Sequence, residues 1–239
     1  HGFFPYKSLR ESARGVGFEN LDPDRDGKVR RLLVQLKNRE GHFFHAAVMT
    51  VLSGFLDEER VRDWLDHIPA DGEDRILINY PGELSSFKRV SFADLLEAQS
   101  GGGEEWREWL EGRILIVGST AVGSADMKST VFSDRFPACA VYASAVHTLL
   151  AGAYLREPGP WLLYGSLLLA CLWGAWTARR YTPLKSILFL VGGAAAYFAL
   201  AVALFHHTGR IVPVLTPLFG MTLTYIVIVF LSYLDVLLA

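Results

Sequence analysis

Charge is nearly absent from the last third of the sequence. Of the 25 acidic residues in the 239-residue chain, 24 lie before Trp161 and only Asp235 lies after it. The 23 basic residues divide 19 to 4 at the same point, so the two parts carry about −5 and about +3. A soluble domain is typically ~25% charged, so the part of the chain after residue 160 cannot be an ordinary soluble domain. We place the boundary between residues 157 and 158, where Pro158, Gly159 and Pro160 end any arriving helix.

Cysteine is also scarce, and no basic stripe is present. Cys139 and Cys171 lie on opposite sides of the boundary, so a disulfide between them is not expected. The mildly acidic first part argues against a nucleic-acid partner. The chain begins at His1 without a Met or the core of a signal peptide, and we expect a segment with a targeting signal to precede it.

Three long apolar runs follow the boundary, at residues 161–178, 184–205 and 211–234. Each has about the 17–25 residues of helix that cross a hydrocarbon core of ~30 Å. Lys185, at the start of the second run, is the only charged residue within the three runs, and Asp235 follows the third run. Buried helices of a large soluble protein would need polar helices to cover them, and the sequence has none to spare. Residues 158–239 are therefore predicted to form three transmembrane helices in a lipid bilayer.

The loops between these runs predict the orientation. The first loop region carries Arg179, Arg180 and Lys185, whereas the second carries only Arg210. Short loops rich in Lys and Arg stay in the cytoplasm. We therefore expect a multi-pass protein of the inner (cytoplasmic) membrane, with an extracytoplasmic soluble domain and a cytoplasmic C-terminus.

Small residues and prolines are the notable features inside the runs. Gly192, Gly193 and Ala196 permit close helix packing, with a neighbour in this chain or in another subunit. Pro213 and Pro217 predict a kink or a late start of the third helix. No carboxylate lies deep in a run, so a transporter is not expected.

Strands and helices alternate in residues 1–157, which predicts an α/β sandwich around a mixed sheet. The run at 113–118 is the best candidate for a buried strand, and Ser91 is a predicted helix N-cap. The expected strands are 15–18, 29–34, 75–80 and 113–118, and the expected helices are 41–55, 58–67, 92–99, 104–110 and 141–151.

An acidic stretch at residues 22–27 resembles the opening of an EF-hand calcium loop. The twelfth position is Leu33, where a bidentate Glu is required, and the ninth is Arg30, which repels a cation. A tight acidic turn, with Asp26 followed by Gly27 in a positive-φ conformation, explains the stretch better.

Two segments that follow predicted strands contain candidate ligand contacts. Ser119, Thr120 and Asp126 lie after the strand at 113–118, where ligands often bind in α/β sheets, although a structural loop explains them equally well. Asn79 and Tyr80 end the strand at 75–80, where a Pro-Gly turn is the simpler interpretation.

Residues for catalysis are few. His42 and His45 share a predicted helix but lack a third metal ligand, and no serine has the context of a nucleophile elbow. We expect no enzyme, no metal and no cofactor.

The order of short motifs along the chain resembles the type-two CHASE domain, the extracytoplasmic sensory module of bacterial receptors. The resemblance covers roughly residues 15–235, with the three membrane runs directly after the domain. The motifs are Gly17-Phe18 with Asp22, Asp24-Arg25-Asp26-Gly27, Arg30-Arg31, Ile78-Asn79-Tyr80 with Gly82, Val90-Ser91-Phe92, the stretch 110–121 with Asp126 and Thr130, Val141-Tyr142-Ala143, and Leu150-Ala151-Gly152.

Two details depart from the family pattern. Ala140 precedes the Val that opens the last helix, where the family usually has Gly, and residues 128–131 lack the usual Pro. The resemblance implies an N-terminal membrane helix before residue 1 and a cytoplasmic cyclase or kinase after the third span.

Three functions are therefore compared. The resemblance implies a sensor that relays a stimulus to an output module, with an unidentified small molecule as a possible ligand and a homodimer as the expected form. The alternative is a non-catalytic accessory subunit that braces a larger membrane complex. An anchored extracytoplasmic enzyme has the least support.

Overall fold

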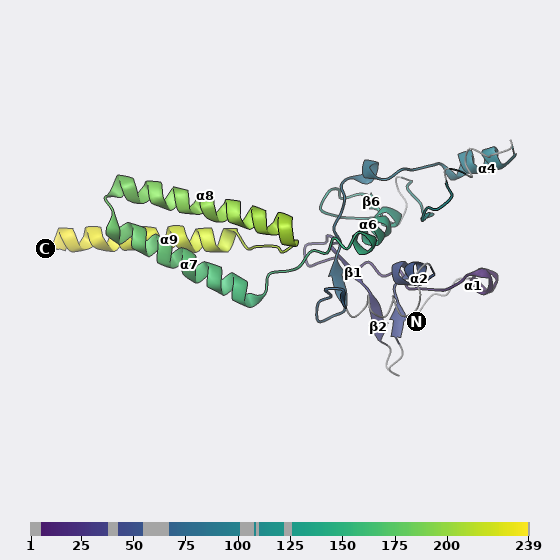
Figure 1. The fold of residues 1–239 in the computed structure, drawn as a ribbon, viewed down its shortest axis with the longest axis horizontal. Helices are drawn as coiled ribbons and strands as arrows, with labels where there is room; N and C mark the ends of the chain where they lie inside the picture. Colours follow the sequence, from purple (N-terminus) through teal and green to yellow (C-terminus); the bar gives the residue numbers. More distant parts are fainter. Residues whose placement is uncertain are drawn as a thin grey trace. The chain divides into compact units, whose positions relative to one another are not determined.

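The chain folds into two compact units, His1–Tyr154 and Leu155–Ala239. We call them the soluble unit and the transmembrane unit, and Figure 1 draws both. The structure is a computed structural model, and it describes residues 6–37, 43–54, 67–100, 108, 110–121 and 126–238.

The soluble unit pairs its described strands in three antiparallel ribbons: β1 with β4, β2 with β3, and β5 with β6. The predicted α/β sandwich around one mixed sheet is therefore not confirmed, because these ribbons do not join among the described residues. In chain order the elements are α1 (Lys7–Ser12), β1 (Arg31–Leu33), β2 (Gln35–Lys37), β3 (Phe43–His45), α2 (Ala47–Ser53), β4 (Arg75–Leu77), the 3-10 helix η1 (Leu84–Ser86), α4 (Phe92–Ser100), β5 (Met127–Lys128), β6 (Phe136–Pro137) and α6 (Ala138–Leu150).

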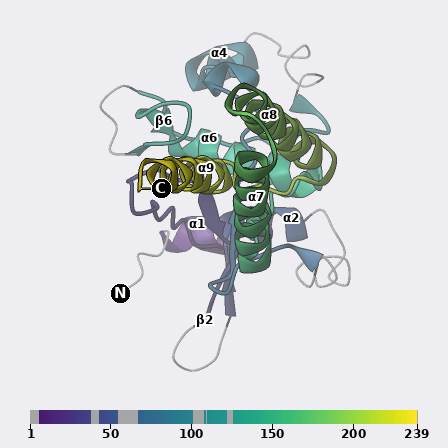
Figure 2. The ribbon, with the colours of Figure 1, turned by 90° about the vertical axis from the view of Figure 1, so that its left-hand side faces the viewer.

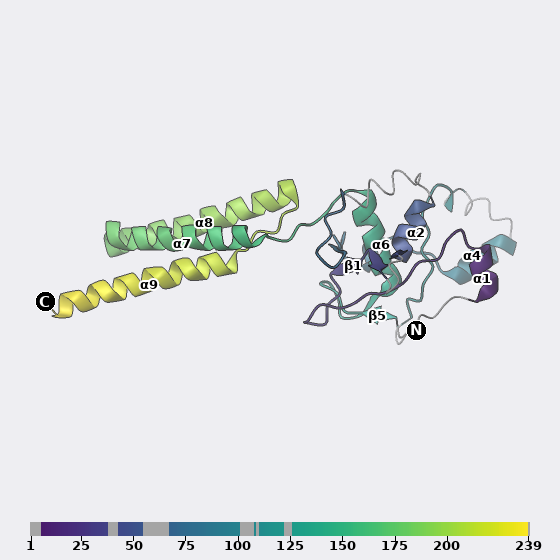
Figure 3. The same cartoon turned by 90° about the horizontal axis from the view of Figure 1, so that it is seen from below.

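The core of the soluble unit forms where α2 and α6 meet the β1–β4 ribbon (Figure 3). Leu32 of β1 lies opposite Ile76 of β4, and both side chains are buried. Burial of such a side chain stabilises the folded state by about 1.5–3 kcal/mol. The helices add apolar side chains to the same cluster, namely Val48, Met49, Leu52, Val141, Ala145 and Leu149.

Several predicted elements are confirmed. β1 lies within the predicted strand 29–34 and β4 within 75–80, while α4 and α6 match the helices at 92–99 and 141–151 to within three residues at each end. Ser91 caps α4, because its Oγ accepts a hydrogen bond from the N–H of Ala93 (3.3 Å). The predicted helices 58–67 and 104–110 lie almost entirely outside the described residues.

The run 41–55 is not the single helix that the sequence predicts. Its described part begins with strand β3, and α2 follows. The N–H of Ala46 donates to the carbonyl of Val34 (2.9 Å), which keeps the backbone extended before α2. Ala46 also forms a parallel bridge with Phe18, and this bridge is all that forms of the predicted strand 15–18. Apolar periodicity does not separate a buried strand from a buried helix, which is why the prediction was wrong.

The predicted strand 113–118 is also wrong. These residues are described but form no strand, and the side chain of Val117 is 82% exposed. Ile114 alone packs partly against the core. A strand requires a hydrogen-bonding partner, and an apolar run in the sequence does not supply one.

The transmembrane unit consists of α7 (Pro160–Arg180), α8 (Pro183–Thr208) and α9 (Leu215–Leu238). Each helix is long and apolar enough to cross a membrane, so the three predicted spans are confirmed. The predicted late start of the third span is confirmed as well, because α9 begins after Pro213 and has Pro217 in its first turn, where no intrahelical N–H is needed.

Glycines allow α7 to pack closely on its neighbours, and Figure 2 shows it between α8 and α9. A Cβ placed on Gly174 of α7 would lie 2.5 Å from the carbonyl oxygen of Met221 in α9. A Cβ on Gly193 of α8 would lie 2.3 Å from Nε1 of Trp173. Gly192 has nothing within 4 Å of its Cβ position, and Ala196 is exposed. Of the three predicted packing residues, the structure thus places one against α7 and two on an uncovered face.

Candidate functional site

Helix α6 is the element around which the candidate residues of the soluble unit gather. Pro137 precedes its first residue, and Gly152 follows its end with a φ of +60°, a conformation that favours glycine. Its inner face is apolar except for Ser144 and Thr148, whose side chains are fully buried. Because buried hydroxyls are costly without partners, their hydrogen bonds show what the helix holds in place.

Thr148 holds the end of β4 through Asn79. The Asn79 N–H donates to Oγ1 of Thr148 (2.9 Å), and the Thr148 hydroxyl has the carbonyls of Ser144 (2.8 Å) and Asn79 (3.3 Å) as acceptors. The Asn79 side-chain Nδ2 donates to the carbonyl of Ala153 (3.1 Å), and the Ala153 N–H donates to the carbonyl of Thr148 (3.2 Å). We call Asn79, Thr148 and Ala153 the Asn79 clamp, because they fix the chain just after α6.

Tyr80 is held in the core by its ring and by its hydroxyl. The ring packs edge-on against Phe132 (centroids 6.2 Å apart) and Phe136 (5.9 Å). The hydroxyl donates to the carbonyl of Val29 (2.9 Å), and burial raises the pKa of the phenol well above its usual value. Tyr80 therefore stays neutral and acts as a packing and hydrogen-bonding group.

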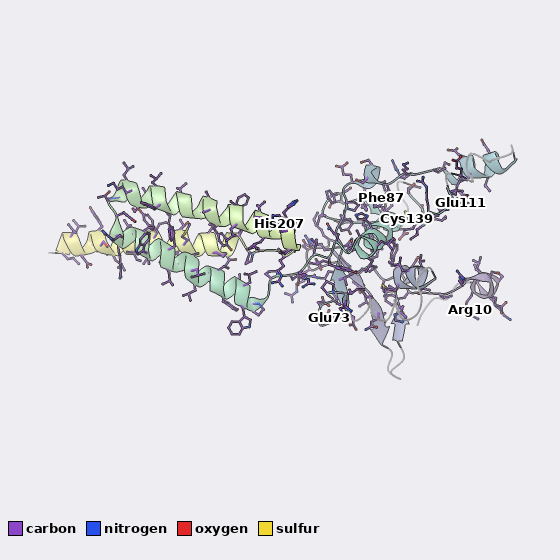
Figure 4. All side chains as sticks on the ribbon, in the orientation of Figure 1. Arg10, Glu73, Phe87, Glu111, Cys139 and His207 are labelled. Carbon is purple, nitrogen blue, oxygen red and sulfur yellow. The ribbon has the colours of Figure 1, made fainter. Side chains whose placement is uncertain are left out.

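The other predicted residues lie near the first turn of α6, where Cys139 is labelled in Figure 4. The carbonyl of Asp126 accepts a hydrogen bond from the N–H of Ala138 (3.0 Å). A Cβ on Gly118 would lie 2.4 Å from Cβ of Cys139, so the segment containing Ser119 and Thr120 runs close to this turn. The side chains of Ser119, Thr120 and Asp126 are exposed. These three predicted residues are thus exposed on two segments that each approach the first turn of α6.

The Cys139 thiol lies on that turn but is poorly suited to nucleophilic chemistry. Burial is the largest effect and raises its pKa; the N–H of Ala140 opposes this rise, and the negative charge of Asp126 adds a smaller increase. A thiol kept protonated is a weak nucleophile, since the thiolate is the reactive form. We therefore assign no catalytic step to this turn.

The five predicted residues do not form one site. Asn79 points to the last turn of α6, whereas Asp126 contacts the first. The residues of α6 that they contact, Ala138 and Thr148, are ten positions apart, which is about 15 Å along a helix. Sequence reasoning missed Thr148 and Ala153. The available signal was a threonine on the apolar face of a predicted helix.

The acidic turn has the predicted conformation. Gly27 has a φ of +81°, and its N–H donates to the carbonyl of Asp24 (2.8 Å). Arg30 binds Asp26 through two hydrogen bonds (2.9 and 2.7 Å) and also binds Asp24 (3.0 Å), which pairs with Arg31 too. The hydrogen bond from Arg30 lowers the pKa of Asp26 to about 2. The arginines occupy the carboxylates that a calcium ion would need, so the turn interpretation is preferred.

Metal ligands do not gather in the described part of the chain. No group of three or more His, Cys, Asp or Glu residues is placed there to hold a metal ion.

The transmembrane unit begins with a second hydrogen-bonded connection. The N–H of Arg156 donates to the carbonyl of Gly209 (3.0 Å), and the N–H of Ile211 donates to the carbonyl of Arg156 (2.9 Å). The segment before α7 is therefore bound to the turn between α8 and α9. Two residues earlier, Oη of Tyr154 is buried and has no hydrogen-bond partner among the described residues.

The comparisons with known proteins identify a family. The family model of the CHASE2 domain matches residues 5–179, which is most of the chain and includes nearly all of α7. No curated protein and no solved structure matches the chain.

Proposed function

We propose that this chain, which belongs to the CHASE2 domain family, is the sensory part of a membrane receptor that relays a stimulus to a cytoplasmic output module. The family match and the three apolar helices after the soluble unit support this function. The bases between α7 and α8 favour an extracytoplasmic soluble unit and a C-terminus in the cytoplasm. A bacterial inner membrane is the setting that this orientation implies.

The stimulus acts, in this proposal, at the first turn of α6. Ser119, Thr120 and Asp126 are exposed near that turn, and in this proposal the two hydroxyls are the first contacts of a small polar ligand. Asn79 and Tyr80 are already engaged within the core, so we assign them to holding the fold rather than to ligand contact. A ligand shifts the domain only if it binds one arrangement more tightly than the other.

The single observation that carries the relay is the pair of connections around residues 153–156. Asn79 holds the carbonyl of Ala153, and three residues later Arg156 is bound to Gly209 and Ile211. A displacement of α6 thus reaches α7 through the chain and reaches the α8–α9 turn through the hydrogen bonds of Arg156. The buried hydroxyl of Tyr154, which precedes Arg156 by two residues, has no hydrogen-bond partner among the described residues, and a buried hydroxyl without a partner destabilises the arrangement that holds it.

Hydrogen exchange in the full chain, reconstituted in lipid bilayers, tests the relay. The variant Asn79→Ala removes the bond to Ala153, and we expect the amides of Ala153, Arg156 and Ile211 to exchange about fivefold faster, since one hydrogen bond is worth about 1 kcal/mol. Asn20→Ala, at an exposed asparagine, is the matched control and should change nothing.

The signalling output of the intact receptor in cells is the second readout, and Asn79→Ala should change it while Asn20→Ala does not. Unchanged exchange at Arg156 and Ile211 together with unchanged output would refute the relay.

An accessory subunit is the second candidate, favoured by the uncovered small-residue face of α8. Gly192 has an open Cβ position and Ala196 is exposed, so another helix can approach there. Purification decides between the two functions. Purification as a homodimer, with a second copy on this face, supports the receptor. Co-purification with unrelated membrane subunits at a fixed stoichiometry supports the accessory subunit.

A further inference from the structure

The turn between α7 and α8 carries a cluster of exposed cations. Arg179 and Arg180 end α7, and Lys185 lies in the first turn of α8. All three are exposed, and none forms an ion pair with another described residue of the chain. Asp235 is the only carboxylate within α7, α8 and α9. The cluster therefore presents three positive charges without a counter-ion from its own unit.

Aromatic rings hold this turn in a defined conformation. Tyr181 stacks on Phe189 of α8 (centroids 4.4 Å apart, planes at 17°) and packs edge-on against Trp176 of α7 (5.3 Å, 89°). Further along, Oγ of Ser186 and the hydroxyl of Tyr225 in α9 are 2.8 Å apart and share a hydrogen bond. The cations consequently project from fixed helix ends rather than from a long loop.

The start of α8 adds backbone donors on the same side of the turn. Pro183 is its first residue, and the side chain of Thr182 makes no capping bond. The amides of Leu184 and Lys185 belong to the first turn and so have no intrahelical acceptor. The positive end of the helix dipole, in a helix of 26 residues, favours an anion there.

We propose that this turn binds the phosphate group of an anionic phospholipid in the adjacent membrane leaflet. Arg179, Arg180 and Lys185 contact the phosphate, and the amides at the start of α8 complete its hydrogen bonding. A lipid fits better than a soluble phosphate because Trp176 and Phe189, 46% and 41% exposed, lie beside the cations as an apolar surface for the glycerol and acyl chains. The other turn, between α8 and α9, has a single base, Arg210, and serves as the natural control.

The purified full chain in detergent, titrated with phosphatidylglycerol or with phosphatidylcholine of the same acyl chains, tests the proposal by native mass spectrometry of bound lipid. We expect selective retention of phosphatidylglycerol. The triple variant Arg179→Gln, Arg180→Gln, Lys185→Gln should lose about a hundredfold in affinity, and Lys185→Gln alone roughly fivefold, from the usual contribution of a base near an anionic surface. Lys185→Arg and Arg210→Gln should bind as the wild type does.

Three results would overturn the proposal. The first is equal retention of the two lipids by the wild type. The second is unchanged affinity in Lys185→Gln, a single change that keeps two of the bases and so serves if the triple variant does not fold. The third is displacement of phosphatidylglycerol by glycerol phosphate at equal concentration, which would identify a soluble phosphate as the occupant.

Discussion

The two units of this chain are stabilised in different ways. The soluble unit buries apolar side chains in a core, where the Thr148 hydroxyl also accepts a hydrogen bond from the N–H of Asn79. The transmembrane unit instead brings backbones together at glycines, as at Gly174 against Met221, and its outer surface is apolar.

The difference follows from the solvent that each unit meets. In water, removal of apolar surface drives packing. In lipid that drive is absent between helices, and close van der Waals contact replaces it. A core truncation should therefore matter most in the soluble unit, and an added methyl group at a helix contact should matter most in the transmembrane unit.

The largest effect is expected from Leu32→Ala. Leu32 is fully buried in the core of the soluble unit, opposite Ile76 of β4, so its truncation should reduce the free energy of unfolding by about 2–5 kcal/mol. Chemical denaturation of the full chain in detergent, followed by circular dichroism, measures this. Leu9→Ala, at a side chain that is 64% exposed in α1, is the control and should change stability by less than about 0.5 kcal/mol. Equal effects of the two changes would mean that Leu32 is not in the core.

A smaller effect is expected from one methyl group in the transmembrane unit. Gly174→Ala places a Cβ 2.5 Å from the carbonyl oxygen of Met221, so α7 and α9 must separate, at a cost of about 1–3 kcal/mol. Thermal unfolding in detergent should show a lower midpoint for this variant. Gly192→Ala adds the same methyl group where nothing lies within 4 Å, and it should be neutral or slightly stabilising. A lower unfolding midpoint for Gly192→Ala than for Gly174→Ala would contradict the packing of α7 on α9.

Two tyrosines of the soluble unit should respond with opposite signs to loss of a hydroxyl. Tyr80→Phe removes the hydrogen bond to the carbonyl of Val29 and should destabilise by about 1 kcal/mol. Tyr154→Phe removes a buried hydroxyl that has no partner among the described residues, so it should be neutral or stabilising. Denaturation under the conditions used for Leu32→Ala compares the two. Destabilisation by Tyr154→Phe would show that its hydroxyl has a partner.

The smallest effect concerns pH at the acidic turn. The pKa of Asp26 is lowered from 3.8 to about 2 in the folded state, chiefly by hydrogen bonds from Arg30. A group with a depressed folded pKa adds stability above its unfolded pKa and loses it as pH falls through the folded value. The loss should therefore occur between about pH 4 and pH 2. Because the pair is on the surface, the effect should be small and should weaken in high salt.

Denaturation midpoints of the wild type and of Asp26→Asn, measured from pH 5 to pH 2, test this. The two curves should converge as the pH approaches 2. Parallel curves would mean that the hydrogen bonds between Asp26 and Arg30 contribute nothing to the stability of the fold.

Local signals accounted for most of what the sequence predicted correctly. The three spans follow from composition, the start of α9 from Pro213, and the acidic turn from Gly27. Each of these depends on residues within one helix or one turn.

Non-local pairing accounts for what was missed. Residues 113–118 have the composition of a buried strand, but strand formation depends on a partner far away in the sequence. Asn79 was a candidate ligand contact, with a Pro-Gly turn as the simpler interpretation, and the side-chain bond that the structure gives it goes to the carbonyl of Ala153, 74 residues away. No pattern within the 75–82 segment identifies that partner.

The most direct test of the receptor function is to find on which side of the membrane the soluble unit lies and on which side the α7–α8 turn lies. In a Cys139→Ala, Cys171→Ala background, one variant carries Ser119→Cys in the soluble unit and another carries Thr182→Cys in the α7–α8 turn, both at exposed positions. A membrane-impermeant maleimide added to intact cells should label the first variant, and should label the second only after the membrane is permeabilised. Labelling of Thr182→Cys in intact cells, with Ser119→Cys protected, would place the soluble unit in the cytoplasm and contradict the proposed function.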